Sequence, residues 1–549
     1  MFDFIIIGAG SAGCVLANRL SANPDHSVCL LEAGVSGYDK KHKYLLKVPL
    51  GVGLLMWHPT LNWGFHSKEE AELKHRTLYS PRGKVLGGSS AVNAMVYIRG
   101  QQKDYDDWAA AGNHGWGWDD LLPLFKRHEN QLRTASDLDG KDALDGHLHS
   151  TNGPLCVGDP NQLDILSHTF IKAGEELGYP NNPDFNGENQ EGFGAYQVTQ
   201  LNGERWSASR AFLEPIKNRK NLTILTEAHA AKLLIEDHKA IGVEYIKSNC
   251  INRIHAKKEV IVCGGTFASP QLLLLSGIGP QDELDRHKIP VVQTLPGVGE
   301  NLQDHLDIIL RQKNKQSTGY GLSPRFALRA AKAPFKYLKS RQGFLASNAA
   351  EAGAFIKSDE NQSRPDLQLH FTPTYLKKHG RSKPPLGHAY SLHLCNLRPK
   401  SRGEVRLNST DASEAPRIHY RFLHDPADMA VMIKAVKLGR KILETKAFSP
   451  YRKKELAPGE DKQSDEDIAA YIREEAESIY HPVGTCKMGN DAMSVVDAQL
   501  RVVGIQGLRV ADASIMPSLI SGNTNAISMV IAEKAADLIL EKTQLKRDG

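Results

Sequence analysis

The hydrophobic pattern at the amino terminus predicts two buried strands joined by a turn and a helix. The apolar runs at 4–7 and 28–31 are short and uninterrupted, which is typical of parallel strands that are buried on both faces. The glycine-rich stretch GAGSAG at 8–13 lies between them and leads into a helical stretch, and Glu32 follows the second run directly. This order of strand, glycine loop, helix, strand and acid predicts a βαβ unit with a dinucleotide site.

Three glycines give this loop its chemistry. Together they allow a tight turn, a close approach of the backbone to a pyrophosphate, and close packing of the helix on the strand. The helix amino terminus points amides at the phosphates, and Glu32 would hold a ribose. This context favours nucleotide binding over an ordinary glycine loop, but it does not choose between NAD and FAD. The candidate nucleotide-binding residues in this unit are Gly8, Gly10, Ser11, Ala12, Gly13, Glu32 and Ala33.

Later segments predict a return to the same sheet. The stretch 81–100 concentrates glycine, serine and asparagine, so we expect its backbone to approach a phosphate or a flat ring closely. The runs at 222–225, 240–245 and 260–263 predict strands, and a helical run at 269–275 follows them. We interpret these elements as the continuation of the sheet that begins at the amino terminus.

Glycine and proline residues at 277–280 and 296–299 indicate a domain boundary, and we expect a second domain after it that covers much of 305–480. A sheet that includes strands near 405 and 417 would form one wall of a pocket. The predicted elements here are strands at 405–407 and 417–420 and helices at 427–443 and 465–477.

The carboxy-terminal pattern repeats the opening one. A strand at 508–510, a turn at 512–517 and a long apolar helix that starts after 521–523 predict a second passage through the first sheet. The amino terminus of that helix is a second candidate site for an anion or a cofactor edge. His481 immediately precedes a proline, and this restricted step can fix the direction of its ring.

Composition restricts the cellular compartments and the binding partners that are expected for this chain. A chain of 549 residues predicts two domains, and its seven cysteines form no C-x-x-C pair, so neither a metal site nor a disulfide framework is indicated. The fingerprint begins at residue 4 and no apolar stretch is long enough to span a bilayer, which predicts a cytoplasmic protein. The net charge of +5 is modest, and the sequence has no cluster of basic residues with aromatic residues between them. Nucleic acid is therefore not expected as a partner.

Five motifs in order resemble those of the glucose-methanol-choline (GMC) family of flavoenzymes, most closely its bacterial FAD-dependent alcohol dehydrogenases and choline dehydrogenases. They are the amino-terminal fingerprint and the stretches PRGKVLGGSSAVNAMVYIRG at 81–100, GGTFASPQLLLLSGIGP at 264–280, HPVGTCKMG at 481–489 and LRVADASIMPSLISGNTNA at 508–526.

The resemblance implies an α/β fold (α+β overall), in which a Rossmann-like FAD-binding domain is interleaved with a substrate domain built on an antiparallel sheet with helices. We expect the FAD-binding domain to comprise 1–155 and 201–304, with a carboxy-terminal return at 481–549 that carries the catalytic residues. The substrate domain would comprise 156–200 and 305–480.

The same resemblance implies how FAD is bound. Its adenosine would lie at the fingerprint, with Ala230 against the adenine, and its isoalloxazine near residues 93–95. In some relatives a histidine in the 81–100 motif carries the flavin covalently, and Val92 stands at the matching position, so we expect non-covalent FAD. The further cofactor residues implied are Arg82, Gly83, Val85, Gly88, Ser89, Asn93, Ala94, Met95, Val96, Asp512, Ala513, Asn525 and Ala526.

The implied chemistry is oxidation of a primary alcohol to an aldehyde. Flavin N5 accepts a hydride, so the protein supplies a base and an oxygen clamp, and we assign these roles to His481 and Asn525. Taken alone, such a histidine is more often a surface or core residue and such an asparagine a helix cap, but the five motifs favour the catalytic roles. The alternatives are a choline dehydrogenase, a lyase or decarboxylase on the same fold, and a nucleotide-binding or NAD-dependent protein.

Two residues bear on the substrate. Glu351 falls where choline-oxidising relatives place a carboxylate against a quaternary ammonium, but a hydrogen-bonded structural carboxylate is the alternative. His370 lies on a predicted strand, either lining the pocket or within the core. Few aromatic residues cluster around Glu351, which favours an uncharged medium-chain alcohol over choline.

A basic segment bears on the electron acceptor. Residues 311–341 contain nine Lys or Arg and no acid, and five of these recur at helical spacing with apolar residues between them. Pro334 would kink or end such a helix. If this segment docks on an anionic leaflet, peripherally on the cytoplasmic face of the inner membrane, it would bring reduced flavin near a quinone. The alternative is that the segment is only a solvated face of the protein. Another acceptor, natural or artificial, remains open, as does the oligomeric state.

Overall fold

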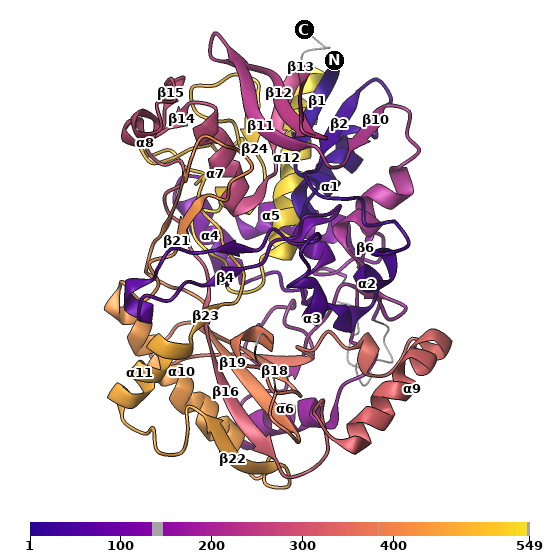
Figure 1. The fold of residues 1–549 in the computed structure, drawn as a ribbon, viewed down its shortest axis with the longest axis vertical. Coiled ribbons are helices and arrows are strands. Elements are labelled where there is room, and N and C mark those ends of the chain that lie inside the picture. The colour runs from indigo at the N-terminus through magenta and orange to yellow at the C-terminus, as the bar shows by residue number, and fades with distance from the viewer. Residues whose placement is uncertain (134–145, 381, 383, 546–549) are drawn as a thin grey trace.

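Two seven-stranded sheets lie at opposite ends of the long axis of the molecule (Figure 1). The structure, a computed structural model, describes residues 1–133, 146–380, 382 and 384–545. Helices flank both sheets, and the predicted α/β (α+β overall) class is confirmed. Among the described helices, none combines the length and the apolar character needed to cross a bilayer.

The first sheet has the order β10-β2-β1-β13-β12-β11, and β24 also pairs with β13. β24, β13, β1, β2 and β10 run parallel, whereas β12 and β11 extend the sheet as an antiparallel meander. The strands are β1 (Phe2–Ile7), β2 (Val28–Leu31), β10 (Leu222–Leu225), β11 (His229–Glu236), β12 (Lys239–Lys247), β13 (Cys250–Val262) and β24 (Leu508–Val510).

Helices α1 (Ser11–Leu20) and α12 (Asn525–Leu545) pack against each other beside this sheet, as Figure 1 shows in indigo and yellow. The residues of β2 are all buried, because apolar side chains that point to both faces are covered on both. The strands predicted at 4–7, 28–31, 222–225 and 508–510 are therefore confirmed, and so is the return of the carboxy-terminal segment to the first sheet.

The second sheet is antiparallel, with the order β22-β16-β19-β18-β17-β7, and β23 also pairs with β16. Helix α10 (Pro426–Glu444) packs on β19 and β16, and α6 (Ile165–Glu176) packs on β7 and β17. The strands are β7 (Gly192–Ala195), β16 (Leu306–Asn314), β17 (Ala352–Ile356), β18 (Leu367–Thr372), β19 (Ala389–Asn396), β22 (Arg452–Ala457) and β23 (Glu477–Ser478).

Shorter elements connect and cover the two sheets. The remaining helices are α2 (Lys43–Lys47), α3 (Val52–Leu55), α4 (Gln102–Ala110), α5 (Trp118–His128), α7 (Gly265–Leu275), α8 (Gln281–Arg286), α9 (Pro324–Ser340) and α11 (Asp465–Glu475). The two-stranded sheets pair β3 (Phe65–His66) with β4 (Tyr79–Ser80), β5 (Glu129–Gln131) with β6 (Leu155–Val157), β8 (Gln200–Leu201) with β9 (Glu204–Arg205), β14 (Ile278–Gly279) with β15 (Gln293–Thr294), and β20 (Glu404–Arg406) with β21 (Arg417–His419).

Two expectations about elements need correction. The strands predicted near 405 and 417 form the separate ribbon β20–β21 rather than part of the second sheet. Helix α9 does not end at Pro334 but continues to Ser340. Its first turn is capped by Ser323, which accepts a hydrogen bond from the Phe326 amide at 3.2 Å, and Pro334 lies on the exposed side, where its ring meets little of the protein.

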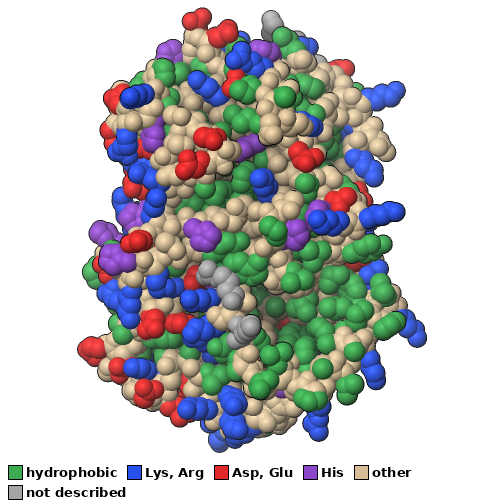
Figure 2. All heavy atoms as spheres, viewed as in Figure 1, with side chains coloured by type: hydrophobic (Ala, Val, Ile, Leu, Met, Phe, Trp, Pro, Cys, Tyr) green, Lys and Arg blue, Asp and Glu red, His purple; other side chains and the backbone are tan. Residues whose placement is uncertain are grey.

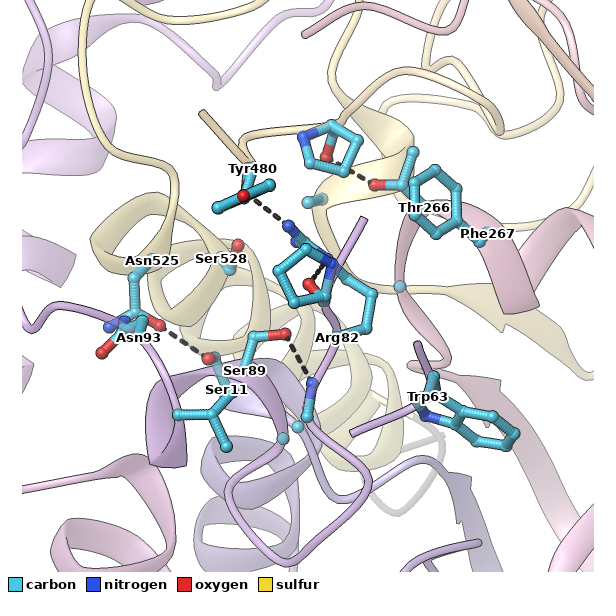
Figure 3. Close-up of a pocket in the computed structure, with 18 of the residues that line it drawn as sticks. Ser11, Trp63, Arg82, Ser89, Asn93, Thr266, Phe267, Tyr480, Asn525 and Ser528 are labelled. Carbon is cyan, nitrogen blue, oxygen red and sulfur yellow. Dashed lines mark hydrogen bonds between the residues drawn. The ribbon is translucent and has the colours of Figure 1, made fainter. Parts of the chain in front are cut away.

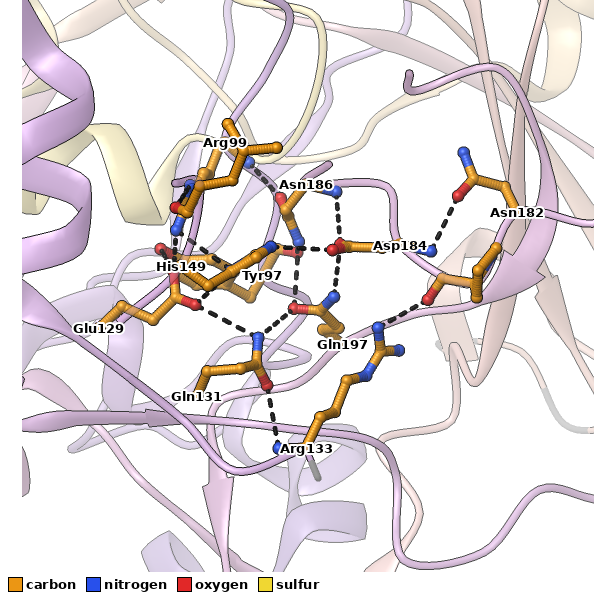
Figure 4. A network of polar contacts seen from close by, with 12 residues as sticks. Tyr97, Arg99, Glu129, Gln131, Arg133, His149, Asn182, Asp184, Asn186 and Gln197 are labelled. Atoms are coloured by element: carbon orange, nitrogen blue, oxygen red, sulfur yellow. Dashed lines mark hydrogen bonds and ion pairs between the residues drawn. The ribbon is translucent and has the colours of Figure 1, made fainter. Parts of the chain in front are cut away.

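A buried polar network ties the 97–99 segment to β5 and to the loop around 184 (Figure 4). Arg99 forms an ion pair with Glu129, and His149 lies between Glu129 Oε1 at 2.7 Å and Asp184 Oδ2 at 2.8 Å. Burial acts to lower the pKa of His149, but the hydrogen bonds to Asp184 and Glu129 prevail and raise it to about 9. His149 is therefore charged at neutral pH.

Candidate active site

One long cavity runs from the glycine loop after β1 to the loop that follows β23 (Figure 3). Eighteen of the predicted cofactor residues line it, which places the amino-terminal fingerprint, the 81–100 motif and the start of α12 around a single space. They are Gly8, Gly10, Ser11, Ala12, Glu32, Ala33, Arg82, Gly83, Gly88, Ser89, Asn93, Ala94, Met95, Val96, Ala230, Asp512, Ala513 and Asn525.

Three predicted cofactor residues do not line this cavity. A Cβ on Gly13 would lie 1.9 Å from the Gly8 carbonyl oxygen, so this glycine serves the packing of α1 on the loop. Val85 is buried in a small apolar cluster with Leu55, and Ala526 is buried in the first core.

The first glycine loop leaves room for a ligand at one position. A Cβ added to Gly10 would meet no atom within 4 Å, so the loop backbone borders open space there. Glu32 closes the end of β2, and its two oxygens accept hydrogen bonds from the amides of Ala9 at 2.9 Å and Gly34 at 2.8 Å. Burial raises the pKa of this carboxyl to about 7. The loop thus fits a phosphate at Gly10, with Glu32 nearby for a ribose.

The second glycine segment packs directly on the first. A Cβ on Gly88 would lie 2.7 Å from the Cα of Gly10, so neither loop could approach the other with a larger residue at 88. Arg205 then donates to the Asn93 carbonyl at 2.6 Å and holds the chain where residues 93–95 line the cavity. Val92 also lines it and offers an apolar side chain.

A carboxylate secures the opposite wall. Asp512 Oδ2 accepts hydrogen bonds from the Gly265 amide at 2.8 Å and from Ser269 Oγ at 2.6 Å, which ties the start of α7 to the loop after β24. Gly265 has a φ of 80°, and a Cβ there would again meet nothing within 4 Å. Both walls therefore present bare backbone to the same cavity, as binding of an extended nucleotide requires.

At the far end of the cavity, the turn that carries His481 is held in a strained conformation. Tyr480 has a φ of 73°, in the left-handed region that non-glycine residues rarely adopt. Asp304 Oδ1 accepts a hydrogen bond from the His481 amide at 2.8 Å. Arg82 donates to the Tyr480 carbonyl at 2.5 Å, as Figure 3 shows. These bonds compensate the strain and fix the position of the imidazole.

The hydrogen bonds of His305 determine which nitrogen of His481 is free. Burial lowers the pKa of His305 to about 4, so it is neutral at pH 7, and its Nε2 lies 3.1 Å from the Leu397 carbonyl oxygen, to which it donates. Its Nδ1 is therefore the acceptor for His481 Nδ1, 3.0 Å away. His481 Nε2 consequently carries the lone pair, and burial together with His305 holds the pKa of His481 well below its usual range.

The asparagine that lies beside His481 is Asn523 rather than the predicted clamp Asn525. Asn523 Nδ2, not Asn525, lies 2.9 Å from His481 Nε2, and Asn523 Oδ1 accepts a hydrogen bond from Gln368 Nε2 at 3.0 Å. Asn525 Oδ1 accepts one from Ser11 Oγ at 2.7 Å, between the starts of α12 and α1 (Figure 3). Asn525 is the first residue of α12, and its side chain contacts the start of α1 beside the glycine loop instead of His481.

Glu351 does not line the cavity. Its Oε2 accepts hydrogen bonds from the Asp164 amide at 2.7 Å and Ser167 Oγ at 2.8 Å, and its Oε1 accepts from Tyr320 at 2.7 Å and Ser347 at 2.6 Å. The carboxylate is fully buried and satisfied by the protein itself. This arrangement matches the structural alternative considered for it.

The cavity wall near His481 is rich in imidazoles. His370 lines it with an Nε2 that has no hydrogen-bond partner among the described residues, and burial lowers its pKa to about 3. His379 and His393 line it as well. With His305 and Asn523, these two are site residues that the sequence reasoning missed. The only sequence signal for Asn523 was the stretch Gly-Asn-Thr-Asn. It contains two asparagines, and the sequence does not indicate which of them faces His481.

The amino-terminal and carboxy-terminal models of one family, GMC oxidoreductase, match residues 2–307 and 399–532. The chain belongs to this family. Its members are FAD flavoproteins, which resolves the choice between NAD and FAD that the fingerprint left open.

Similar proteins align over the full length. An alcohol dehydrogenase (acceptor) of Pseudomonas putida is 48% identical over 547 residues, 99% of this chain and 97% of the relative. An oxygen-dependent choline dehydrogenase of Brucella anthropi is 41% identical, over 99% and 96%. The crystal structure of pyridoxine 4-oxidase from Mesorbium loti matches with a TM-score of 0.87 and 30% identity, over 98% of this chain and 99% of that one.

Proposed function

We propose that this GMC oxidoreductase oxidises a primary alcohol to the aldehyde, with FAD as hydride acceptor, His481 as base and Asn523 as oxygen clamp. The observation that carries the proposal is the pairing of His481 Nε2 with Asn523 Nδ2, 2.9 Å apart and both on the cavity that FAD would enter. When bound, the flavin accepts a hydride at N5. The 48% identical relative is an alcohol dehydrogenase.

The side chains perform the remaining chemistry. His481 Nε2 takes the hydroxyl proton of the alcohol, and the Asn523 amide N–H donates to the oxygen as negative charge develops on it. The low pKa keeps His481 unprotonated at neutral pH, and the buried carboxylate of Asp307 favours the imidazolium that forms. His305, which accepts from His481 Nδ1, keeps the ring in the tautomer that this reaction needs.

An uncharged alcohol is the favoured substrate over choline. A quaternary ammonium needs an accessible carboxylate or an aromatic cage, and the two oxygens of Glu351 are both engaged behind the cavity wall. Choline stays the second candidate because a 41% identical relative is a choline dehydrogenase.

The test is anaerobic reduction of the bound flavin, followed by its absorbance, with choline and a series of uncharged primary alcohols. We expect faster bleaching with the uncharged alcohols, and Glu351→Gln should leave the order of substrates unchanged. No bleaching by any alcohol would refute the proposed reaction. A preference for choline that Glu351→Gln abolishes would reverse the choice of substrate.

The flavin in this proposal is held without a covalent bond. Val92, at the position where some relatives have a linking histidine, has no nucleophilic atom to offer. Acid precipitation should therefore release all the flavin to the supernatant, whereas yellow colour retained on the pelleted polypeptide would contradict a non-covalent site.

Helix α9 is the proposed contact with a membrane, on the cytoplasmic face of the inner membrane. Three large apolar side chains on it are exposed, Leu328 at 68%, Phe335 at 78% and Leu338 at 67%. Figure 2 shows an apolar area at the lower right of the molecule, where Figure 1 places α9. Leu54 on α3 is 68% exposed, and the α3 residues Val52 and Gly53 line the cavity. The basic residues on this helix are Arg325, Arg329, Lys332, Lys336 and Lys339.

Such a surface suits an anionic leaflet, because apolar side chains enter the interface while the cations meet lipid phosphates. Docking there would hold the cavity side of the protein near a membrane quinone, which we propose as the electron acceptor. Oxygen uptake that accounts for every alcohol oxidised would refute the quinone.

A further inference from the structure

Two imidazoles to which the proposed reaction gives no part meet the carboxylate of Asp307 beside the cavity. Asp307 lies on β16, His393 on β19 and His379 in the turn at 378–380. Asp307 Oδ2 is 2.7 Å from His393 Nδ1 and 3.2 Å from His379 Nε2, and the three atoms all lie within 4.8 Å of one another. The sequence gives no sign of this cluster, because more than seventy residues separate the carboxylate from the first imidazole.

The carboxylate is buried without a permanent cation. Asp307 is 1% exposed, and in the described part of the chain its only ion-pair partners are the two imidazoles. Buried charges in proteins are paired or coordinate metals, so a buried carboxylate that shares one oxygen with two imidazole nitrogens favours a shared cation.

Two further hydrogen bonds fix the orientation of the Asp307 carboxylate. Asp307 Oδ1 accepts hydrogen bonds from the Leu394 amide at 3.1 Å and from Cys395 Sγ at 3.4 Å. These bonds turn the other oxygen, Oδ2, toward both imidazoles, which is the arrangement by which outer partners orient metal ligands.

A buried histidine beside the cluster independently indicates that another ligand, such as a water, binds there. His370 is 4% exposed, its Nε2 has no partner among the described residues, and its ring centroid lies 6.5 Å from that of His393. It lines the same cavity as His379 and His393. Leaving a buried donor or acceptor unsatisfied is unfavourable, and a water bound to a cation at the cluster would satisfy it.

We propose that Asp307, His379 and His393 bind one divalent transition-metal cation, with its remaining coordination positions open to the substrate end of the cavity. Two imidazoles and one carboxylate suit Zn²⁺, Co²⁺ or Ni²⁺ rather than Mg²⁺ or Ca²⁺, which prefer oxygen ligands. Each imidazole would coordinate through the nitrogen that now faces Asp307 and carry its proton on the other one.

The test uses the full-length FAD-loaded protein without a histidine tag, stripped with a chelator and titrated with Zn²⁺ by calorimetry, with metal counted after gel filtration. We expect one Zn²⁺ per chain, and affinity at least about 100-fold weaker in His379→Gln and in His393→Gln. The matched control is His66→Gln, an exposed histidine that does not line the cavity.

Two results would overturn the site: no saturable binding by the wild-type protein, or binding that the cluster variants leave unchanged. His379 is in a short turn outside the sheets, so His379→Gln keeps the test valid even where His393→Gln fails to fold. Flavin content and flavin reduction by alcohol are read separately, so the failure of this site and the failure of the proposed reaction are distinguishable.

Discussion

At the scale of single residues, the position of one proton on His481 decides what the site can do. Because His305 donates to a backbone carbonyl, the free nitrogen of His481 faces Asn523 and the cavity. The sequence predicted His481 as the base from an X-Pro histidine within a family motif; the structure places this side chain on the cavity, and its role as base stays a prediction. No local pattern encodes the tautomer, because it depends on a contact with a residue 176 positions away.

The first prediction concerns the base. His481→Ala should retain FAD, because this side chain holds no part of the glycine loops, but flavin reduction by alcohol should slow by about 10²-fold or more, the usual worth of a general base. Stopped-flow measurement under anaerobic conditions reports this step directly. A variant that reduces its flavin as fast as the wild type would remove His481 from this role.

The second prediction separates the two asparagines. Asn523→Ala should slow flavin reduction by about 10²-fold, since removing a single oxyanion donor costs about 10²–10³. Asn525→Ala should leave reduction nearly unchanged but weaken flavin retention, because it breaks the contact with Ser11 beside the glycine loop. The matched pair differs by two positions on one segment, and the reverse pattern of effects would restore Asn525 as the clamp.

At the scale of elements, the sequence predicted regular structure well wherever the hydrophobic period was clean. The runs at 28–31 and 222–225 became strands with those bounds. The sequence missed the pairing of β20 with β21 as a ribbon on its own, because pairing depends on neighbours that lie far away in the chain. For α9 the sequence left open whether Pro334 would kink or end the helix, and the helix continues through it to Ser340.

The third prediction concerns α9. The triple variant with Lys332, Lys336 and Lys339 changed to glutamate should co-sediment less with anionic vesicles than the wild type, and added salt should also reduce recovery, because each charge contributes about 1 kcal/mol. Lys217, Lys220 and Lys462 are exposed elsewhere, and changing them to glutamate makes the same change in net charge as a control. Equal recovery with neutral and anionic vesicles at low salt would show that α9 is only a solvated face.

At the scale of the whole molecule, the buried network of Figure 4 sets a pH limit on stability. His149 has a folded pKa of about 9, above its ordinary value of 6.5, so its stabilising contribution is complete below pH 6.5 and is lost as pH rises through 9. This amounts to about 3 kcal/mol of the free energy of unfolding. The melting temperature should therefore decrease as the pH is raised from 6.5 to 9.

The measurement is the melting temperature as a function of pH in the wild type and in His149→Gln, with the exposed His114→Gln as control. His149→Gln should melt lower at pH 6 and show a flatter decline toward pH 9. On the acid side, Asp184, whose pKa is lowered to about 2, loses its contribution only as pH falls below its ordinary value near 4. Parallel pH curves for the wild type and His149→Gln would contradict the assignment of the decline to this histidine.

The position of β24 in the first sheet has a consequence for biosynthesis. The second sheet needs no residue beyond β23, which ends at Ser478, whereas the first sheet waits for β24 at Leu508–Val510. On the ribosome, the substrate half can therefore close while the nucleotide half still lacks its last strand and the whole of α12. We therefore expect FAD to bind only after the whole chain has been made, because a nascent chain that stalls before β24 still lacks Asp512 and Asn525, which line the cavity.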